Sequence, residues 1–580
     1  MASVRATTAT VDGTVPLTRV LSRPSNLPLL LINLQSPLKP LAADDTNSTE
    51  SLYYTAGVVE FRPSRNASDV ALADNLAGYL EIISSVAAEP TDIIVFPEST
   101  LNSGDTATYV PEPESGTTPC LLGNASDYSD FLVQISCAAR AARKYIVINL
   151  TERSKCVVSA VDPRPCAPNG LNIFNTNVVF DREGKVISRY RKWNLYGEPK
   201  NTTYSAELSS FDTDFGVVFG HFVCFDILFY EPAQRLVSLG FTDVIFPSMW
   251  FSQIPFLTGV QFQESWAYSN DVNVLAAGSS LPAVGSTGSG IYAGRAGPIL
   301  SVMNTGEGER RIYVARVPKK TQNKRNVPAA IQVTETVVKP KVRQRLNQAD
   351  ITLKRDYLEH YESILVDFSN VSNRAEHDVC YKTFCCHFEL QWHQLTTGSE
   401  GQHYTYRLGA YEGMRNEAGA ETTNAIRNCA VFTCIGEDID DCGRIFPADV
   451  VQQPQVAFDR ISIESNYQTG YPYLLMPNSL RDDLKPLAVN EFVWEEYDLL
   501  VNSEVMRHAR YTLNTTTDNL LTFSIYGNFY NGDGFINGTT NSPPTESTTT
   551  LDPNNGGGAA VLLNPIFLIC TLAVLLGVVA

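Results

Sequence analysis

Three side chains of the kinds used in catalysis stand at predicted strand ends or in turns. Glu98 follows the apolar run Ile93–Phe96 and a proline, Lys192 lies among aromatic residues, and Cys224 ends another apolar run. Enzymes with α/β folds place their reactive groups in turns at the ends of strands. A carboxylate, an ammonium and a thiol are groups that acid–base and nucleophilic catalysis use. The three positions are therefore candidates for one site.

Each candidate also has an ordinary structural explanation. A glutamate after a strand is usually a capping or surface acid, and a lysine among aromatic residues usually extends its ammonium to solvent. A cysteine within Phe-Val-Cys-Phe is usually an inert core residue. Considered one at a time, Glu98, Lys192 and Cys224 do not identify an active site. Only their combination is informative.

Strand-like and helix-like patterns alternate from residue 53 to about residue 317, and these elements must position the three side chains. The apolar runs predict strands over Tyr53–Phe61, Asp92–Phe96, Tyr145–Leu150, Ile173–Phe180, Val244–Phe246 and Val272–Ala277. Helical periodicity is found over Asp69–Ala88, Tyr128–Arg143 and Pro255–Tyr268. This alternation indicates a layered α/β fold for a first domain over residues 51–320.

The composition changes after Val317. Residues 321–350 are basic and polar without a sustained period, which is typical of a linker. Short strand-like pieces then occur among turns and cysteines, at Tyr404–Leu408, Val431–Thr433, Val456–Ile461 and Thr522–Tyr526. We therefore predict a smaller, β-rich second domain over residues 351–530.

Ten of the twelve cysteines form an even set when Cys224 and Cys570 are set aside. They are Cys120, Cys137, Cys156, Cys166, Cys380, Cys385, Cys386, Cys429, Cys434 and Cys442. Clustered cysteines in even number indicate disulfides in a secreted chain. The group from Cys380 to His393 also offers thiol and imidazole ligands for zinc, but it lacks a CxxC pair. We therefore expect disulfides of undetermined connectivity and no metal.

Charge and glycosylation motifs indicate an extracellular protein. The net charge is −18 and no long basic cluster occurs, which argues against a nucleic-acid partner. Eight Asn-x-Ser/Thr motifs are candidate glycosylation sites: Asn47, Asn66, Asn124, Asn149, Asn201, Asn370, Asn514 and Asn537. Asn149 is the weakest of them, because it ends the apolar stretch Tyr145–Leu150 that is predicted to be a buried strand.

The two ends of the chain carry candidate targeting segments. Residues 531–558 form a Ser/Thr/Asn/Gly-rich stalk, and the uncharged apolar segment 559–580 ends the chain. This order is typical of a glycosylphosphatidylinositol signal, with Asn554 or Asn555 as the attachment residue, and a retained membrane helix is the alternative. Residues 1–50 form a leader whose apolar run, Leu27–Leu34, is short and late for a signal peptide.

The three candidates resemble, in order and context, the triad of the nitrilase superfamily of carbon–nitrogen hydrolases. The matching motifs are Phe-Pro-Glu98 after a strand, Tyr-x-Lys192-x-x-Leu, and Cys224-x-Asp after a strand. Further blocks resemble the vanin and biotinidase branch, in the form of an insect vanin-like protein: Phe222–Ala233, Phe246–Trp250 and Gln263–Ala267. The resemblance implies a four-layer αββα sandwich with a smaller, β-rich, disulfide-bonded second domain.

The resemblance also implies a role for each residue. Cys224 would be the nucleophile that forms a thioester, and Glu98 the proton acceptor that later serves the leaving amine and the water. Lys192, as proton donor and oxyanion stabiliser, would act with the backbone N–H of Phe225, and Trp250 would form a wall of the pocket. No organic cofactor is needed for this chemistry.

Three neighbouring residues modify this expectation. Glu198 would support the site as a second acid, and Asp226 would order the loop after the nucleophile. Arg191 stands where the branch usually has histidine, so an additional positive charge is expected beside the site.

The favoured substrate is pantetheine, whose amide would give pantothenate and cysteamine. The lipid-anchor tail favours this reading over the alternative, biotinyl-lysine amide, because biotinidase is soluble. A third hypothesis is a non-catalytic, lipid-anchored surface protein on a nitrilase scaffold. The expected location is the outer face of the cell membrane, and the sequence leaves the oligomeric state open.

Overall fold

The computed structural model describes residues 52–123, 127–320, 351–370, 372–395, 401–415, 424–447 and 450–530. The predicted leader, linker, stalk and tail lie outside these residues. So do Asn47, Asn124, Asn537, Asn554, Asn555 and Cys570.

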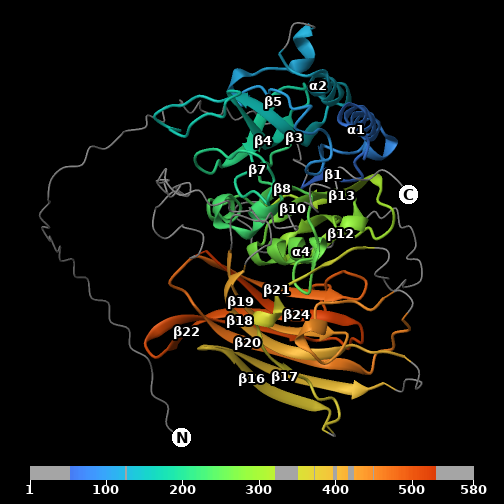
Figure 1. Cartoon of the computed structure of the whole chain (residues 1–580), viewed down its shortest axis with the longest axis vertical. Coiled ribbons are helices and arrows are strands. Elements are labelled where there is room, and N and C mark those ends of the chain that lie inside the picture. The colour runs from blue at the N-terminus through green and yellow to red at the C-terminus, as the bar shows by residue number, and fades with distance from the viewer. Residues whose placement is uncertain are drawn as a thin grey trace, which may run out of the picture. The chain divides into compact units, whose positions relative to one another are not determined.

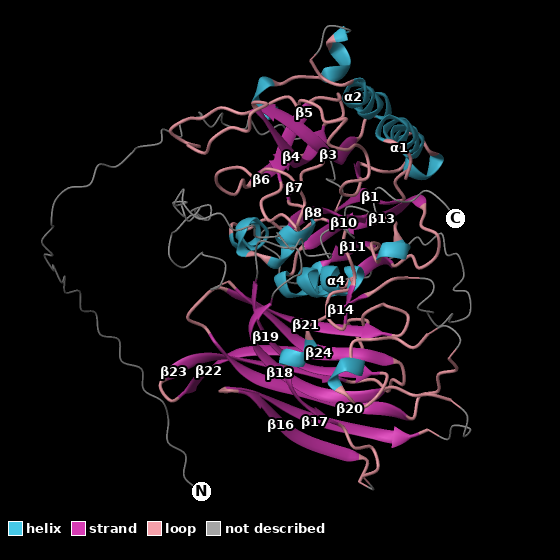
Figure 2. Cartoon of the chain, viewed as in Figure 1, coloured by secondary structure: helices cyan, strands magenta, loops and turns pink. Residues whose placement is uncertain are grey.

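Two six-stranded sheets form the inner layers of residues 52–320 (Figures 1 and 2). The first sheet has the order β13 (Arg310–Pro318), β1 (Tyr53–Phe61), β2 (Ile93–Val95), β3 (Tyr145–Lys155), β4 (Leu171–Phe180), β5 (Val186–Arg191). The second has the order β12 (Pro298–Val302), β11 (Ser289–Ala293), β10 (Asn273–Gly278), β8 (Asp243–Ser248), β7 (Val218–His221), β6 (Ser209–Asp212). Both sheets mix parallel and antiparallel pairs.

Helices cover the outer faces of both sheets. Helices α1 (Ser68–Ile83) and α2 (Asp130–Ala142) share a buried cluster with β2 and β3. Helices α3 (Arg235–Ser238) and α4 (Gly259–Asn270) share another with β8 and β10. The result is the predicted αββα sandwich. No helix in the described part of the chain is both long and apolar enough to cross a membrane.

The inner strands are apolar at successive positions because they are buried on both faces. In β2, Ile93 and Val95 lie in the core between the two sheets, while Ile94 lies in the core under the helices. In β10, Leu275 likewise faces the other sheet and Val274 faces α4. This is why strand patterns without polar alternation predicted these elements correctly.

Helix α1 is shorter than predicted. The apolar pattern continues to Ala88, but the α-helix ends at Ile83 and a separate 3₁₀ turn follows at Val86–Ala88. The hydroxyl of Ser84 donates to the carbonyl of Leu80 at 2.8 Å, and that of Ser85 to the carbonyl of Ile82 at 2.8 Å. These side chains satisfy the last carbonyls locally and end the helix.

The second domain is an antiparallel sandwich of two five-stranded sheets (Figure 2). One has the order β15 (Glu362–Leu365), β18 (Thr405–Arg415), β19 (Asn424–Cys434), β24 (Leu520–Phe529), β21 (Tyr473–Arg481). The other has the order β16 (Arg374–Tyr381), β17 (Phe384–Gln394), β20 (Val456–Gln468), β23 (Glu504–Leu513), β22 (Phe492–Val501). The β-rich prediction is confirmed, although it located only β18, β19, β20 and β24.

All ten cysteines assigned to disulfides are paired. The bonds are Cys120–Cys137, Cys156–Cys166, Cys380–Cys385, Cys386–Cys429 and Cys434–Cys442. Cys386–Cys429 joins β17 to β19 and therefore links the two sheets of the sandwich. The thiols that the zinc alternative would use, Cys380, Cys385 and Cys386, are all paired in disulfides. Among the described cysteines, Cys224 is the one outside a disulfide.

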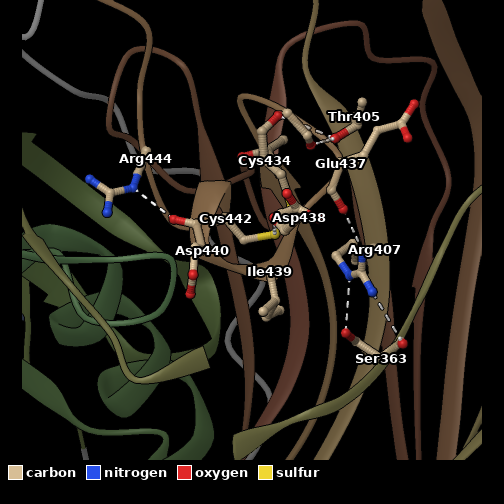
Figure 3. The surroundings of a disulfide bond; sticks show 12 residues. Ser363, Thr405, Arg407, Cys434, Glu437, Asp438, Ile439, Asp440, Cys442 and Arg444 are labelled. Carbon is tan, nitrogen blue, oxygen red and sulfur yellow. Dashed lines mark hydrogen bonds between the residues drawn. A yellow bond between two sulfur atoms is a disulfide. The ribbon is translucent and has the colours of Figure 1, made fainter. Parts of the chain in front are cut away.

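The disulfide Cys434–Cys442 closes a short loop of the sandwich (Figure 3). Within the sandwich, Arg407 donates to the carbonyl of Glu437 at 2.7 Å. From outside the loop, Arg355 donates to the carbonyls of Cys442 at 2.7 Å and Ile439 at 2.8 Å. The loop therefore anchors the strand that carries Arg355.

That strand, β14 (Lys354–Arg355), pairs in parallel with β9 (Gln253–Ile254) of the layered domain. Helix α4 adds a second contact, where the amide of Gln261 donates to the side-chain oxygen of Asn478 in β21 at 2.7 Å. The sandwich thus supplies backbone and side-chain partners to the layered domain.

The described glycosylation motifs differ in accessibility. Asn66, Asn201, Asn370 and Asn514 are exposed. Asn149 is fully buried in β3, where its amide nitrogen donates to Asn175 at 2.7 Å and to Asn177 at 3.1 Å. The fold leaves no room for a glycan at Asn149, so the prediction at that position is wrong.

Candidate active site

The structure brings the three predicted residues together at the ends of strands. Glu98 follows β2, Lys192 follows β5 and Cys224 follows β7, and all three line one pocket. Their exposed fractions are 3%, 2% and 6%, respectively. Ionisable groups buried this deeply require partners, because desolvation strongly disfavours isolated charges.

The Glu98 carboxylate is held by three donors. Its Oε1 accepts from Lys192 Nζ at 2.8 Å and from Asn175 Nδ2 at 2.7 Å. Its Oε2 accepts from the backbone N–H of Met249, which follows β8, at 2.7 Å. Donors in β4 and directly after β5 and β8 therefore fix the orientation of this carboxylate, and both sheets of the layered domain contribute.

Glu198 completes the polar cluster. Lys192 Nζ donates to Glu198 Oε1 at 2.5 Å, and Asn175 Nδ2 donates to Glu198 Oε2 at 2.8 Å. Burial opposes the charge on Lys192, but the carboxylates of Glu198 and Glu98 outweigh it and hold the lysine pKa well above its usual value. The ammonium therefore stays protonated throughout the physiological range.

A second lysine reinforces Glu198. Lys200 Nζ lies 3.8 Å from Glu198 Oε2. Burial again opposes the charge on Glu198, yet Lys192 and then Lys200 hold its pKa below the usual value. Burial lowers the pKa of Lys200 itself, and Glu198 offsets part of that effect. Glu198 is consequently an ionised neighbour of Lys192.

Cys224 begins the 3₁₀ helix Cys224–Leu228 in a left-handed backbone conformation, with φ of 49°. This conformation is costly for a residue other than glycine and is typical of functional turns. Cys224 and Phe225 stand at the helix start, where backbone N–H groups have no partner within the helix. The thiol is thus presented beside potential backbone donors.

Asp226 ties the cysteine turn to the lysine segment. Its carboxylate accepts from the N–H of Val223 at 3.0 Å, the hydroxyl of Tyr190 at 2.7 Å and the N–H of Asn194 at 2.8 Å. Burial raises the pKa of Asp226 to about 6, although these donors work in the opposite direction. Asp226 is not among the pocket-lining residues, so it acts by positioning.

The Cys224 thiol is protonated in the resting arrangement. Burial raises its pKa well above the ordinary value, the negative charge of Glu98 adds to this effect, and Lys192 opposes it. The thiol and the Glu98 carboxylate line the same pocket. Such a pair can transfer a proton during nucleophilic attack rather than hold a preformed thiolate.

A pocket that is partly open to solvent lies in front of this cluster. Its walls are largely aromatic and aliphatic: Tyr196, Phe225, Leu228, Met249, Trp250, Phe251 and Leu257. Phe225 and Trp250 therefore lie where the sequence predicted them. Trp250 is also part of the core, because its Nε1 donates to the carbonyl of Leu257 at 2.9 Å and its ring stacks on Phe262.

Arg191 does not add a positive charge to the pocket, contrary to the prediction. Its guanidinium donates to Glu152 at 3.0 and 2.5 Å and lies 4.2 Å from the centre of the Phe174 ring. Successive side chains of β5 point to opposite faces, so Arg191 and Lys192 diverge. The arginine charge is neutralised on the far side of the strand.

Several site residues were missed by the sequence reasoning. Asn175 had a recognisable signal, since it and Asn177 interrupt an apolar strand with groups that need partners. Met249 contributes through its backbone and Gln253 through tertiary packing, so neither had a local signal. The amide oxygen of Gln253 accepts from Arg415 of the sandwich at 2.8 Å.

Comparisons with known families agree with this architecture. Residues 56–279 match the family described as Carbon-nitrogen hydrolase, and residues 351–533 match the Vanin C-terminal domain. The first match covers the layered domain through β10, and the second covers the sandwich.

Similar proteins span most of the chain. Vanin-like protein 1 of Drosophila melanogaster is 51% identical over 515 residues, covering 87% of this chain and 90% of that protein. Biotinidase of Takifugu rubripes is 32% identical over 376 residues, covering 62% and 72%. Pantetheinase of Homo sapiens is 28% identical over 463 residues, covering 78% and 82%.

Proposed function

Because the chain belongs to the vanin-like proteins of the nitrilase superfamily of carbon–nitrogen hydrolases, we propose that its substrate is pantetheine, which it cleaves to pantothenate and cysteamine. Family membership makes the chain an amide hydrolase of the vanin and biotinidase type. The observation that carries the proposal is the buried Glu98–Lys192–Cys224 cluster at the base of an aromatic-walled pocket.

The first half of the reaction forms a thioester. Glu98 accepts the thiol proton as the sulfur of Cys224 attacks the amide carbonyl carbon. The carbonyl oxygen becomes an oxyanion that Lys192 Nζ and the N–H of Phe225 stabilise. Glu98 then gives its proton to the amine nitrogen, the carbon–nitrogen bond breaks, and cysteamine leaves.

The second half regenerates the thiol. Glu98 accepts a proton from water while the water oxygen attacks the thioester carbon, and the same two donors stabilise the second oxyanion. The carbon–sulfur bond breaks as Glu98 returns the proton to Cys224, and pantothenate leaves. Glu198 serves this cycle by keeping Lys192 charged and oriented.

Hydrolysis of biotinyl amides is the second candidate function. It is favoured by the likeness to Takifugu rubripes biotinidase and by pocket walls that are apolar without being specific for one acyl chain. A non-catalytic surface role is less well supported, since all three reactive groups are buried and line one pocket.

Attachment to the outer face of the cell membrane through a lipid anchor is a further part of the proposal. The apolar tail 559–580, the five disulfides and the exposed motifs at Asn66, Asn201, Asn370 and Asn514 support an extracellular setting. Treatment of expressing cells with phosphatidylinositol-specific phospholipase C should release the protein. Retention at the cell surface would instead favour a membrane helix.

The decisive test of the function is cysteamine release from pantetheine by the full purified chain. Release by the wild-type protein and its loss in Cys224→Ala would support both substrate and nucleophile. Biotinyl-lysine is the parallel substrate, and preference for it would favour the second candidate. Inactivity of the folded protein on both amides would contradict the two enzymatic proposals.

A further inference from the structure

We infer that Asn149 is a positioning residue of the reaction, and that it acts by fixing which end of the Asn175 amide faces the two active-site carboxylates. Asn149 does not line the pocket, so it must act through other residues. The inference rests on the proposed function only through the reaction that measures it, since any amide that the wild-type protein hydrolyses serves the test.

The Asn175 amide supports the site in one orientation only. Its nitrogen donates to Glu98 Oε1 at 2.7 Å and to Glu198 Oε2 at 2.8 Å. A reversed amide would present its carbonyl oxygen, which can only accept, to the same two acceptors. The oxygen and nitrogen ends of the amide have nearly the same size, so packing alone does not select between them. Hydrogen-bond partners must select the orientation.

Asn149 supplies this selection from the neighbouring strand. Its Nδ2 donates to Asn175 Oδ1 at 2.7 Å and to Asn177 Oδ1 at 3.1 Å. An amide NH₂ group donates but does not accept, so it pairs with the oxygen end of Asn175 and not with the nitrogen end. All three asparagines are fully buried, so bulk solvent does not compensate a misplaced amide.

The orientation of Asn149 is fixed in turn by the backbone beside Glu98. The N–H of Ser99 donates to Asn149 Oδ1 at 2.9 Å. A backbone N–H can only donate, so the oxygen end of Asn149 faces Ser99 and its nitrogen end faces Asn175. Ser99 has a left-handed φ of 54°, a conformation that is costly for serine and needs support from its surroundings.

These contacts form a closed ring of hydrogen bonds. The ring starts at the N–H of Ser99, passes through the amides of Asn149 and Asn175, and returns to the carboxylate of Glu98. Each member determines the direction of the next, and such networks are worth more together than their separate bonds suggest. Glu98 has to accept and return protons in a fixed geometry, so the ring should affect the chemical steps more than substrate binding.

The test is a double-mutant cycle on kcat with the full purified chain. Asn149→Ala leaves the Asn175 amide free to reverse. It should lower kcat about 10- to 100-fold, since displacing a reacting group by about 1 Å can cost this much, while KM changes far less. Asn175→Ala should cause at least as large a loss. Adding Asn149→Ala to Asn175→Ala should then cost little more, because the residue through which Asn149 acts is absent.

A second variant at the same position identifies the group that matters. Asn149→Asp keeps the size of the side chain and the acceptor for the Ser99 N–H, but it replaces the NH₂ donor. We expect its loss in kcat to be at least as large as that of Asn149→Ala. Should Asn149→Ala fail to fold, Asn149→Ser takes its place in the cycle, because its hydroxyl stands one atom short of the amide nitrogen.

Asn273 provides the matched control. It is fully buried in β10 and donates two hydrogen bonds, to Asp243 at 2.8 Å and to the carbonyl of Pro318 at 2.9 Å, but it does not line the pocket. Asn273→Ala should lower the melting temperature about as much as Asn149→Ala does. Its kcat should stay near that of the wild type, because no active-site carboxylate depends on its amide.

The outcomes separate the inference from the proposed function. Hydrolysis of biotinyl-lysine without hydrolysis of pantetheine would refute the proposed substrate, and the cycle would then be measured on biotinyl-lysine. Folded protein that hydrolyses neither amide would overturn both. With an active wild type, three results would overturn the inference alone: a kcat of Asn149→Ala near the wild-type value, additive losses in the cycle, or an equal loss of kcat in Asn273→Ala.

Discussion

The layered domain and the sandwich bury different kinds of side chain. Among described residues, the layered domain buries ten acidic, basic and histidine side chains, whereas the sandwich side of the chain buries three side chains of these kinds. The ten are Glu60, Glu98, Lys144, Glu152, Asp181, Lys192, His221, Asp226, Asp243 and Glu264. Two of the other three, Asp356 and Arg415, lie where the sandwich meets the layered domain.

This difference indicates that one domain supplies the reactive groups and the other contributes mainly to stability. Buried charges cost desolvation energy, and they persist where function needs them and surrounding structure holds them. The sandwich instead buries the Cys386–Cys429 bond among apolar strands and uses its edge to brace the pocket. The layered domain therefore carries the groups that react, and the sandwich carries a crosslink and contacts that support the pocket-lining residue Gln253.

The largest expected effect is on the chemistry of the layered domain. Cys224→Ala should reduce kcat/KM for pantetheine on the order of 10⁴-fold or more, because the covalent intermediate cannot form. Thermal unfolding should change little, since the substitution removes one buried sulfur. If Cys224→Ala also unfolds, its loss of activity would not separate reactivity from stability. Cys224→Ser, which is closer in size and shape, would then be measured in its place.

The next effect should fall on the stability of the sandwich. The double variant Cys386→Ala/Cys429→Ala opens a loop of 43 residues and should lower the free energy of unfolding by about 4 kcal/mol. The matched pair Cys380→Ala/Cys385→Ala opens a loop of 5 residues and should cost about 2 kcal/mol. Urea denaturation measures both. Equal losses would contradict the assignment of the inter-sheet bond as the main crosslink.

Lys192 should affect both rate and stability. Lys192→Met removes an oxyanion donor and should lower kcat about 10²–10³-fold. It also leaves the buried carboxylates of Glu98 and Glu198 without their shared ammonium, so the melting temperature should fall. Lys200→Met is the control, because Lys200 lies near Glu198 but outside the pocket, and its rate loss should be smaller.

The smallest effect concerns a buried acid away from the reaction. Glu60 accepts hydrogen bonds from the hydroxyls of Thr287 and Ser289, and burial raises its pKa to about 8. Between about pH 4.5 and pH 8 the Glu60 carboxyl therefore carries a proton in the folded state but not in the unfolded state. The free energy of unfolding consequently falls as the pH rises through this window.

Glu60→Gln cannot ionise and should lack this dependence. Relative to the wild type, the variant should gain about 1–3 kcal/mol in the free energy of unfolding between pH 5 and pH 9. Urea denaturation at several pH values gives the slope. Parallel curves for the two proteins would show that Glu60 is ionised in the folded state at neutral pH.

The layered domain was more predictable than the sandwich for a physical reason. Strands such as β1 and β2 are buried on both faces, so their sequences are continuous apolar runs with clear ends. Strands such as β16 and β22 have one face in solvent, with charged and apolar residues interleaved. The alternation of apolar and polar residues in these strands is irregular, so the sequence analysis did not predict them.

The site was predictable in its reactive groups but not in its supports. Glu98, Lys192 and Cys224 belong to local motifs, which can be recognised from neighbouring residues in the sequence. The hydrogen bonds of Glu98 reach residues 77 and 151 positions away, and no local pattern records such pairings. The direction of Arg191 was misjudged for the same reason, since its partner Glu152 is 39 positions away.

The side-chain amide of Asn175 and the ammonium of Lys192 determine how the site responds when charge moves during the reaction. One nitrogen donates to both Glu98 and Glu198, and one ammonium does the same. When the thiol proton passes to Glu98 and the oxyanion forms, the negative charge leaves a carboxylate and appears on the substrate oxygen beside that ammonium. The total charge of the cage stays constant, so its dipoles need little reorganisation as the barrier is crossed.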